Sequence, residues 1–376
     1  MKKFLVLTLI LVWVFTIASC DKNVEVTQPT TMTTTTTTTT QLPVHEHLFG
    51  EWVTIKEPTV TQEGLEERIC ECGEKESQMI PLLPLVYSEG LEFTLNDNGL
   101  SYSLTGIGAC TDTDLVIPNI YNGLPVTNID NFALKDCTWI TSIIIPEYVE
   151  SIGNYTFNWC TLLTNIEVSE DNLYYKSIDG NLFSKDGKTI IRYALGKQDT
   201  SYIISDSVTN IDRYAFYRSY ALTNVVIPDS ITSIGGYAFA YCVSLTSIVI
   251  PDSITSIEEY TFYYCDLLTS VEIPSSVTYI GRSAFGICPL LTNVVIPDSV
   301  TSIGEFAFAF CSSLTRIFIP ISVTSIGQYA FKDCTLLKIY CEVDSKPDGW
   351  YYNPGWGEYN NTWNHLSPVV WGYKPE

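Results

Sequence analysis

The sequence predicts a mainly β solenoid built from stacked coils, and three observations support this prediction. First, residues 228–340 repeat themselves every 23 residues. Second, the copies place apolar residues at shared offsets from an opening proline, and a fixed period of this size is typical of stacked coils. Third, most copies end in Leu-x-x-Ile-x-Ile or Leu-x-x-Val-x-Ile, where two apolar residues spaced by two indicate a strand with both side chains pointing inward. The copies open at Pro228, Pro251, Pro274, Pro297 and Pro320.

The other repeated positions predict how one coil turns. The proline lacks an N–H group, so each coil leaves the strand at the same place. The Asp-Ser that usually follows the proline suits a turn, and Gly235, Gly281, Gly304 and Gly327 allow a sharp corner. The Ala-Phe-x-x-Cys segment predicts a short helical or 3₁₀ turn. One coil cannot bury this much apolar surface alone, so the coils must stack on one another.

The repeated line Ile-Pro-x-Ser-Val-Thr-Ser-Ile-Gly-x-x-Ala-Phe-x-x-Cys-x-x-Leu-Thr-Ser-Ile resembles the BspA-type leucine-rich repeat of bacterial surface proteins. The resemblance covers residues 100–373. It implies a curved, right-handed leucine-rich-repeat solenoid that serves display and binding and has no catalytic centre. The sequence departs from the pattern at Glu258, which replaces glycine, at Ser219, which replaces cysteine, and at Thr261, which replaces alanine; these are tolerable local changes.

The solenoid is predicted over residues 118–340 as about eight coils. These coils start at residues 118, 146, 205, 228, 251, 274, 297 and 320. A longer spacing interrupts the period between Cys160 and Ser219. Within it, residues 169–202 contain strand-like runs on both sides of residues 185–188, which predicts an inserted β-hairpin.

The first 44 residues predict export and tethering rather than a folded domain. Two lysines, an apolar run over residues 4–17 and small residues after it are typical of a signal peptide over residues 1–19. The cysteine directly after Ala-Ser resembles a bacterial lipobox, and this implies that Cys20 carries a lipid that anchors the exported protein at the extracellular face of the cell membrane. A plain secretory signal or a short membrane helix are the alternatives. Residues 20–44, with an unbroken threonine run, predict a disordered linker.

Residues 45–84 predict a small β module. They resemble a short module found in surface proteins of low-GC Gram-positive bacteria. His45, His47, Cys70 and Cys72 have the ligand types of a zinc site, but the Cys-x-Cys spacing departs from the usual Cys-x-x-Cys. We therefore expect a metal-free module, with a zinc site or a disulfide as the alternatives.

Both ends of the solenoid are predicted to be capped. In residues 85–117, two alternating runs flank a turn at residues 96–99, which predicts a hairpin as the N-terminal cap. Residues 341–376 lose the period and gain aromatic residues, as expected where a segment covers the open end of the core. Aromatic side chains also stack on sugars, so Trp350 and Trp356 are the alternative candidates for ligand binding.

Seven of the twelve cysteines occupy one repeat position, three residues after the repeated phenylalanine. Because this position points inward and Ser219 replaces the cysteine in one coil, we predict a column of buried free thiols rather than disulfides. The column consists of Cys137, Cys160, Cys242, Cys265, Cys288, Cys311 and Cys334.

Composition excludes several classes of function. A net charge of −22 with 20 Lys and Arg argues against nucleic-acid binding. The three histidines, His45, His47 and His365, leave the repeats without a Ser-His or Cys-His pair, and the common hydrolase and phosphate-loop motifs are missing. We predict no catalytic residue and no cofactor. The expected function is noncatalytic, adhesin-like binding of an extracellular protein or glycan; a secreted carbohydrate-active enzyme or a purely structural surface component are the alternatives.

Repeated surface positions supply the binding candidates. Threonine and serine rows lie beside the strands, but repetition alone explains them equally well. An aromatic column directly before the Ala-Phe pair has more promise, because tyrosine is favoured at recognition surfaces. We expect this column to be exposed. Its members are Tyr155, Tyr214, Tyr237, Tyr260, Phe306 and Tyr329.

Overall fold

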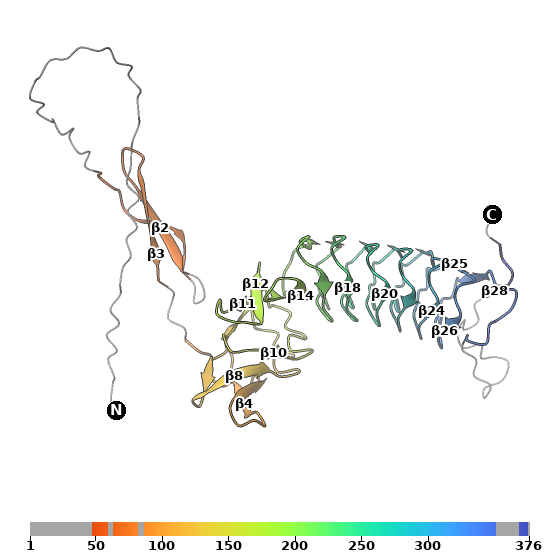
Figure 1. Cartoon of the computed structure of the whole chain (residues 1–376), viewed down its shortest axis with the longest axis horizontal. Coiled ribbons are helices and arrows are strands. Elements are labelled where there is room, and N and C mark those ends of the chain that lie inside the picture. Colours follow the sequence, from red (N-terminus) through yellow and green to blue (C-terminus); the bar gives the residue numbers. More distant parts are fainter. Residues whose placement is uncertain (1–46, 59–62, 82–85, 351–367, 375–376) are drawn as a thin grey trace, which may run out of the picture. The chain divides into compact units, whose positions relative to one another are not determined.

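The computed structural model describes residues 47–58, 63–81, 86–350 and 368–374. The predicted signal peptide, Cys20, the threonine linker, His45 and Trp356 lie outside the described residues. The chain divides into two compact units, Met1–Leu85 and Val86–Glu376 (Figure 1). Within the described ranges, no helix has the length and apolar character needed to cross a membrane.

The described part of the first unit is a three-stranded antiparallel sheet. Its strands, β1 (Val53–Lys56), β2 (Gly64–Ile69) and β3 (Lys75–Ile80), lie in the order β1-β2-β3. Cys70 is the only hydrophobic residue that is buried among the described residues of this unit. A sheet with so little buried apolar surface gains little stability from the hydrophobic effect.

In the second unit, each coil contributes one short strand to each of two rows. The coils stack side by side in register (Figure 1). The first row contains β5 (Tyr102–Gly106), β8 (Leu124–Ile129), β10 (Ser151–Ile152), β14 (Thr189–Arg192), β16 (Asn210–Ile211), β18 (Ser233–Ile234), β20 (Ser256–Ile257), β22 (Tyr279–Ile280), β24 (Ser302–Ile303) and β26 (Ser325–Ile326). The second row contains β6 (Asp114–Val116), β9 (Ser142–Ile145), β11 (Asn165–Val168), β15 (Ser201–Ile203), β17 (Asn224–Val226), β19 (Ser247–Val249), β21 (Ser270–Glu272), β23 (Asn293–Val294), β25 (Arg316–Ile319) and β27 (Lys338–Cys341).

Strand pairing follows the sequence period. Within the regular coils, the strands pair in parallel with a shift of 23 residues, as Ile257 does with Ile280 and Ile248 does with Val271. The same residue type therefore recurs at the same place in successive coils. This register confirms the predicted solenoid.

The first row of the described chain holds ten strands, so the solenoid has about ten turns rather than the predicted eight. The additional turns come from two hairpins. β5 pairs antiparallel with β4 (Glu92–Leu95) and parallel with β8. In residues 169–202, β13 (Asn181–Ser184) pairs antiparallel with β12 (Tyr175–Ile178) and with β14, and β14 also pairs parallel with β16. A hairpin strand such as β5 or β14 lacks the repeat sequence, but its backbone N–H and C=O groups can still pair with the next strand of the row. It therefore adds a turn to the solenoid that the repeat period does not reveal.

The segment after the first strand row is a series of tight turns, so the predicted helical or 3₁₀ turn is wrong. The structure has no helix in the described residues. The N–H groups of Tyr237 and Phe239 donate to carbonyls of the next coil, at 3.0 and 2.9 Å, whereas those of Ala238 and Ala240 donate three residues back, at 3.2 and 3.1 Å. A helix would direct all these groups along its own chain and leave the carbonyls of the neighbouring coil without donors.

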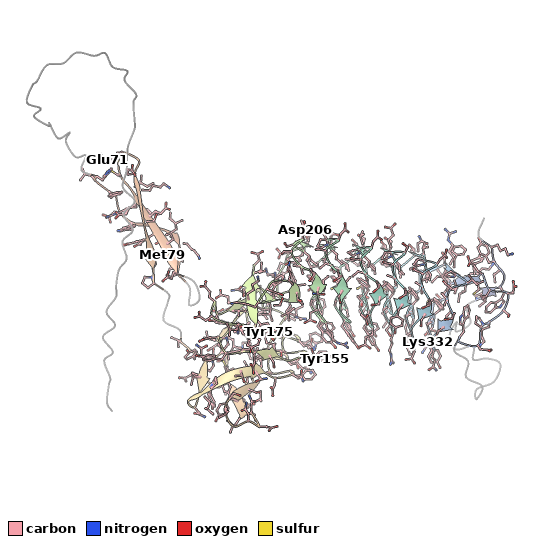
Figure 2. All side chains as sticks on the ribbon, in the orientation of Figure 1. Glu71, Met79, Tyr155, Tyr175, Asp206 and Lys332 are labelled. Atoms are coloured by element: carbon pink, nitrogen blue, oxygen red, sulfur yellow. The ribbon has the colours of Figure 1, made fainter. Side chains whose placement is uncertain are left out.

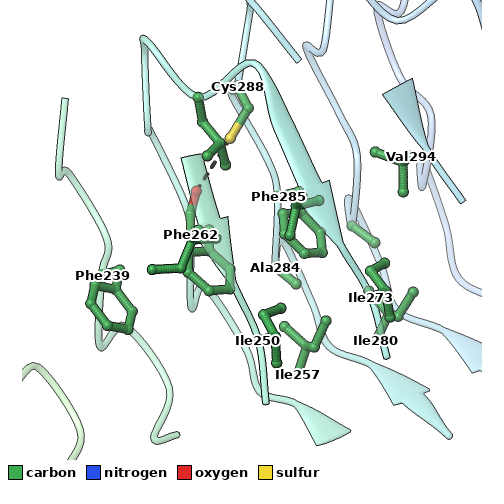
Figure 3. Packing of buried hydrophobic residues seen from close by; sticks show 14 of the residues in the cluster. Phe239, Ile250, Ile257, Phe262, Ile273, Ile280, Ala284, Phe285, Cys288 and Val294 are labelled. Atoms are coloured by element: carbon green, nitrogen blue, oxygen red, sulfur yellow. Dashed lines mark hydrogen bonds between the residues drawn. The ribbon is translucent and has the colours of Figure 1, made fainter. Parts of the chain in front are cut away.

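A column of stacked phenylalanines forms the centre of the core (Figure 3). The rings of Phe239, Phe262 and Phe285 are fully buried, with successive centroids 5.5 and 5.4 Å apart. Beside them, the thiol of Cys288 donates to the carbonyl of Phe262 at 3.3 Å. Cys160, Cys242, Cys265, Cys311 and Cys334 make the same bond one coil apart, at 3.0 to 3.3 Å. The repeat cysteines are buried and unbridged, as predicted.

Trp350 closes the C-terminal end of this core. Its side chain is fully buried, its indole N–H donates to the carbonyl of Val323 at 3.1 Å, and its ring lies 5.7 Å from that of Trp371. β28 (Val369–Val370) extends the sheet beyond β27. Because Trp350 is enclosed, it is not available to stack on a sugar, and this alternative from the sequence is wrong for Trp350.

Candidate functional site

The threonine rows serve the backbone of the solenoid. The hydroxyl of Thr246 donates to the carbonyl of Thr223 at 3.2 Å, and that of Thr269 donates to the carbonyl of Thr246 at 3.1 Å. The row after the proline repeats this bond, as from Thr301 to Thr278 at 3.2 Å. Each hydroxyl supports the interface between two coils, so these rows have a structural role that needs no ligand.

The predicted aromatic column lies where the tight turns form one edge of the coils. Figure 2 shows Tyr155 and Lys332 on this edge and Asp206 on the opposite one. The column is not freely exposed, contrary to the expectation from the sequence: Tyr214 is buried (6% exposed), and Tyr237 is half-buried. The reason is that rings from neighbouring coils cover one another.

Every member of this column has a left-handed backbone, with φ between 56° and 64°. The rings contact one another from coil to coil. Tyr237 stacks on Tyr260 (centroids 4.4 Å apart), whereas Tyr155 with Tyr214 (4.5 Å) and Phe306 with Tyr329 (5.2 Å) form tilted pairs. Such pairs contribute about 0.5–1.5 kcal/mol each beyond the burial of their area. That gain is of the same order as the cost of a left-handed backbone, about 1–2 kcal/mol.

A second column, which the sequence analysis missed, lies directly before the repeat cysteine. Its backbone is also left-handed, and its rings are more open: Trp159 is 38% and Phe310 is 41% exposed. Tyr241 and Tyr264 stack with centroids 5.0 Å apart. The available signal was a recurrent aromatic residue one position before the cysteine. We define the aromatic face as Tyr155, Trp159, Tyr214, Tyr237, Tyr241, Tyr260, Tyr264, Phe306, Phe310 and Tyr329.

Two arginines lie over the rings in one part of the aromatic face. The guanidinium carbon of Arg218 is 3.5 Å from the centre of the Trp159 ring and 4.7 Å from that of Tyr241. Arg213 lies 4.9 Å from the centre of the Tyr237 ring and pairs with Glu259 at 2.6 Å. These contacts orient the rings and place positive charge on the surface of an otherwise acidic protein.

The aromatic face is interrupted in one coil. There, Ser283 occupies the position of the ring in the first column, and a cavity of about 230 Å³ opens between Tyr260 and Phe306. Tyr263 and Phe310 also line this cavity. Ser283 keeps the left-handed backbone of its neighbours, with φ of 50°. This coil thus has the backbone conformation of the aromatic column but no aromatic ring at that position.

A second, smaller cavity of about 70 Å³ lies where the inserted hairpin meets the coils, and Arg192 lines it. This side chain is 6% exposed; its Nη1 donates to the carbonyl of Tyr214 at 2.6 Å, whereas Nε and Nη2 have no hydrogen-bond partner among the described residues. Burial lowers the pKa of Arg192 to about 10, so the group stays charged at neutral pH. The Oδ1 atom of Asn158 in the same cavity also lacks a described partner. Because these donors and this acceptor face the same cavity, we expect ordered water to occupy it and to form hydrogen bonds with them.

In the first unit, the structure brings together three of the four residues with zinc-ligand types. The ligand atoms of His47, Cys70 and Cys72 all lie within 4.8 Å of one another. The fourth, His45, lies outside the described residues.

Comparisons with known proteins match this architecture. A family model described as "BspA type Leucine rich repeat region" matches residues 100–194, 188–290 and 209–338, which together make up more than half of the chain. The crystal structure of the pneumococcal vaccine antigen PcpA is similar, with a TM-score of 0.54 and 22% identity over 69% of this chain and 63% of that chain. The chain therefore spans less than two thirds of the antigen structure.

Two further solved structures are leucine-rich repeat proteins of bacteria. The one from Eubacterium ventriosum has a TM-score of 0.49 and 23% identity, covering 66% of this chain and 69% of its own. The one from Bacteroides ovatus has a TM-score of 0.42 and 20% identity, covering 77% of this chain and 99% of its own. At this level of identity, the likeness concerns the fold alone. A search of curated proteins found no match.

Proposed function

Because the chain belongs to the BspA-type leucine-rich repeat family, we propose that it is a noncatalytic, adhesin-like scaffold that binds a protein partner outside the cell through the aromatic face. Leucine-rich repeat proteins commonly bind proteins, and members of this family are typically exposed on the bacterial surface. One observation carries the proposal for the site: the ring that is missing at Ser283.

The cavity at Ser283 has room for one aromatic ring. Successive rings of the buried phenylalanine column lie 5.0 to 5.7 Å apart, and Tyr260 and Phe306 are two coils apart. A ring inserted between them would lie about 5 Å from each, within the range in which aromatic pairs attract. A tyrosine, tryptophan or phenylalanine of the partner would therefore occupy the empty position of the aromatic column. Such a buried aromatic side chain is a typical anchor of a binding hot spot.

Charge and hydrogen bonding favour a neutral or basic partner. The chain carries a net charge of −22, which repels acidic proteins and accelerates association with basic ones. Burial raises the pKa of the Tyr241 and Tyr263 hydroxyls above their ordinary value. These groups stay protonated at neutral pH and can donate hydrogen bonds to backbone carbonyls of the partner.

Display at the surface requires an anchor, and we propose the lipid on Cys20 for that role. The support is the sequence alone: an apolar segment that ends in Ile-Ala-Ser before the cysteine. Residues 20–44 would then act as a tether with a reach of about 80 Å when fully extended. Such a tether allows the aromatic face to meet partners beyond the membrane surface.

The test is to fill the cavity. Ser283→Tyr supplies the missing ring at a backbone angle that tyrosine already adopts in the neighbouring coils, and Ser283→Ala is the matched control. Random peptides displayed on phage are selected on the mature wild-type chain, and the selected peptides are then measured on both variants. We expect them to be enriched in aromatic residues, to bind Ser283→Ala normally and to bind Ser283→Tyr at least about tenfold more weakly.

Two results would contradict the proposal. Selected peptides that bind Ser283→Tyr as well as wild type would exclude the cavity as the site, provided that urea unfolding shows this variant to be folded. A glycan array that detects tight binding to a sugar, with no peptide selected, would replace the protein partner by a carbohydrate. Release of reducing sugar from that glycan would indicate the enzyme alternative.

A further inference from the structure

The loop after β2 carries two cysteines of the first unit in a tight turn. The N–H of Cys70 donates to the carbonyl of Glu74 at 2.8 Å, and the N–H of Gly73 donates to the carbonyl of Cys70 at 2.8 Å. Gly73 has φ of 92°, a conformation that favours glycine and that allows the chain to reverse directly after Cys72. The turn places Cys70 and Cys72 at one end of the sheet.

The segment before β1 brings a histidine to the same end. Phe49 forms a β-bridge with Cys70, and the N–H of Gly50 donates to the carbonyl of Ile69 at 3.1 Å. Arg68 covers the rings of Phe49 and Trp52, with its guanidinium carbon 5.0 and 4.6 Å from their centres. These contacts hold the segment in place, so that Nδ1 of His47 lies 3.2 Å from Sγ of Cys72.

The distances among the three ligand atoms suit a tetrahedral metal. With zinc–sulfur bonds of about 2.3 Å and a zinc–nitrogen bond of about 2.0 Å, the edges of the tetrahedron are roughly 3.5–3.8 Å long. The imidazole nitrogen and the two sulfurs lie within 4.8 Å of one another without any rearrangement. Small rotations of three side chains would bring them to one ion.

The first unit also needs a means of stabilisation that its core does not provide. Cys70 is its only buried hydrophobic side chain among the described residues, and β1 is exposed along its whole length. Domains of about 40 residues or fewer usually depend on a disulfide, a metal or association with another chain. The two cysteines and the histidine lie where such a link would join the segment before β1 to the turn between β2 and β3.

We infer that His47, Cys70 and Cys72 form a structural site for Zn²⁺ in the first unit, with a fourth position open to water or another ligand. The proposed site differs from the metal-free module that we expected from the sequence. It is independent of the proposed function, because it concerns the other unit of the chain.

The experiment uses the mature chain, reduced and freed of metal with a chelator. Zn²⁺ is titrated against a chromogenic competitor, and Co²⁺ is added in parallel as a spectroscopic probe. We expect one equivalent of Zn²⁺ to bind, and the Co²⁺ complex to show thiolate charge-transfer absorption with the intense visible bands of tetrahedral coordination. Hydrogen exchange of residues 47–81 should slow when Zn²⁺ binds, because the metal binds the folded state.

The variants change only the two exposed ligands, His47 and Cys72. The buried Cys70 is left intact, because its replacement could unfold the module. Cys72→Ser and His47→Ala should each weaken Zn²⁺ binding about 100-fold or more. Glu71→Gln, on the residue between the cysteines, is the matched control and should bind as wild type does. The inference is overturned if wild type binds no Zn²⁺, if Cys72→Ser and His47→Ala bind it like wild type, or if the protein isolated without reductant contains a Cys70–Cys72 disulfide.

Discussion

The left-handed backbone beneath the aromatic face predicts an unusual order of stability among variants of Tyr237. This residue has φ of 60°, where alanine costs about 1–2 kcal/mol and glycine costs little. Glycine also has a larger unfolded-state entropy, which disfavours it by about 0.4–1 kcal/mol relative to alanine. Because the backbone cost of alanine exceeds the entropy cost of glycine, Tyr237→Gly should be about 0.5–1 kcal/mol more stable than Tyr237→Ala. In a helix, by contrast, alanine is the better residue by about 1 kcal/mol.

Both variants should still be less stable than wild type. The Tyr237 ring lies 5.0 Å from that of Tyr214 and 4.4 Å from that of Tyr260. Loss of these two aromatic pairs costs about 1–3 kcal/mol, before any change in buried area. An exposed column, as expected from the sequence, would have cost less than about 1 kcal/mol.

Urea unfolding of the variants, followed by circular dichroism, measures both differences if the m-values agree. Tyr237→Phe is the control, because it keeps the ring and changes only the hydroxyl. If Tyr237→Ala proves as stable as Tyr237→Gly, the argument from backbone strain is refuted. If both match wild type, the stacked rings contribute nothing measurable.

Three further predictions concern the core, the thiols and the anchor. Phe262→Ala removes a fully buried ring from the stacked column and should cost about 3–5 kcal/mol in the same urea assay; a cost below that of Tyr237→Ala would contradict the assigned packing. Burial raises the pKa of Cys242 from 9.0 to about 12, so the unfolded state releases its proton first and stability should fall as pH rises from 9 towards 12. Unfolding midpoints over this range test that, and Cys242→Ser should show a shallower decline. Cys20→Ala should move the protein from the membrane to the medium, and unchanged partition would refute lipidation.

The repeat period was enough to predict the features of the fold that recur in every coil, such as the strand register. The sequence did not predict the backbone conformation of the tight turns, where the chain departs from regular secondary structure. The period of 23 residues led directly to the parallel register, for example of Ile257 with Ile280. It could not reveal that Tyr237 and Tyr241 adopt positive φ, because aromatic residues rarely do so and composition gives no warning. The assignment of Ala-Phe-x-x-Cys to a helical turn failed for the same reason.

The candidate sites were less predictable than the fold because they depend on side-chain position in space. The aromatic column was identified, but its mutual coverage by stacked rings was not, since it depends on the spacing of the coils. The cavity at Ser283 is visible only once the neighbouring rings are placed. Likewise, His47 and Cys72 are separated by 25 residues, and only the β-bridge of Phe49 with Cys70 brings them together.

Departures from the repeat are the most informative positions, because every copy shows what the fold alone requires. Thr261 in place of alanine is used locally: its hydroxyl donates to the carbonyl of Glu258 at 2.9 Å. Ser219 in place of cysteine lies in the first coil after the inserted hairpin, where the preceding turn does not follow the repeat. Ser283 differs from both, because it leaves a cavity between Tyr260 and Phe306 where the neighbouring coils have a ring. Because a ring at this position would contact both Tyr260 and Phe306, its absence supports our proposal that a partner supplies the ring.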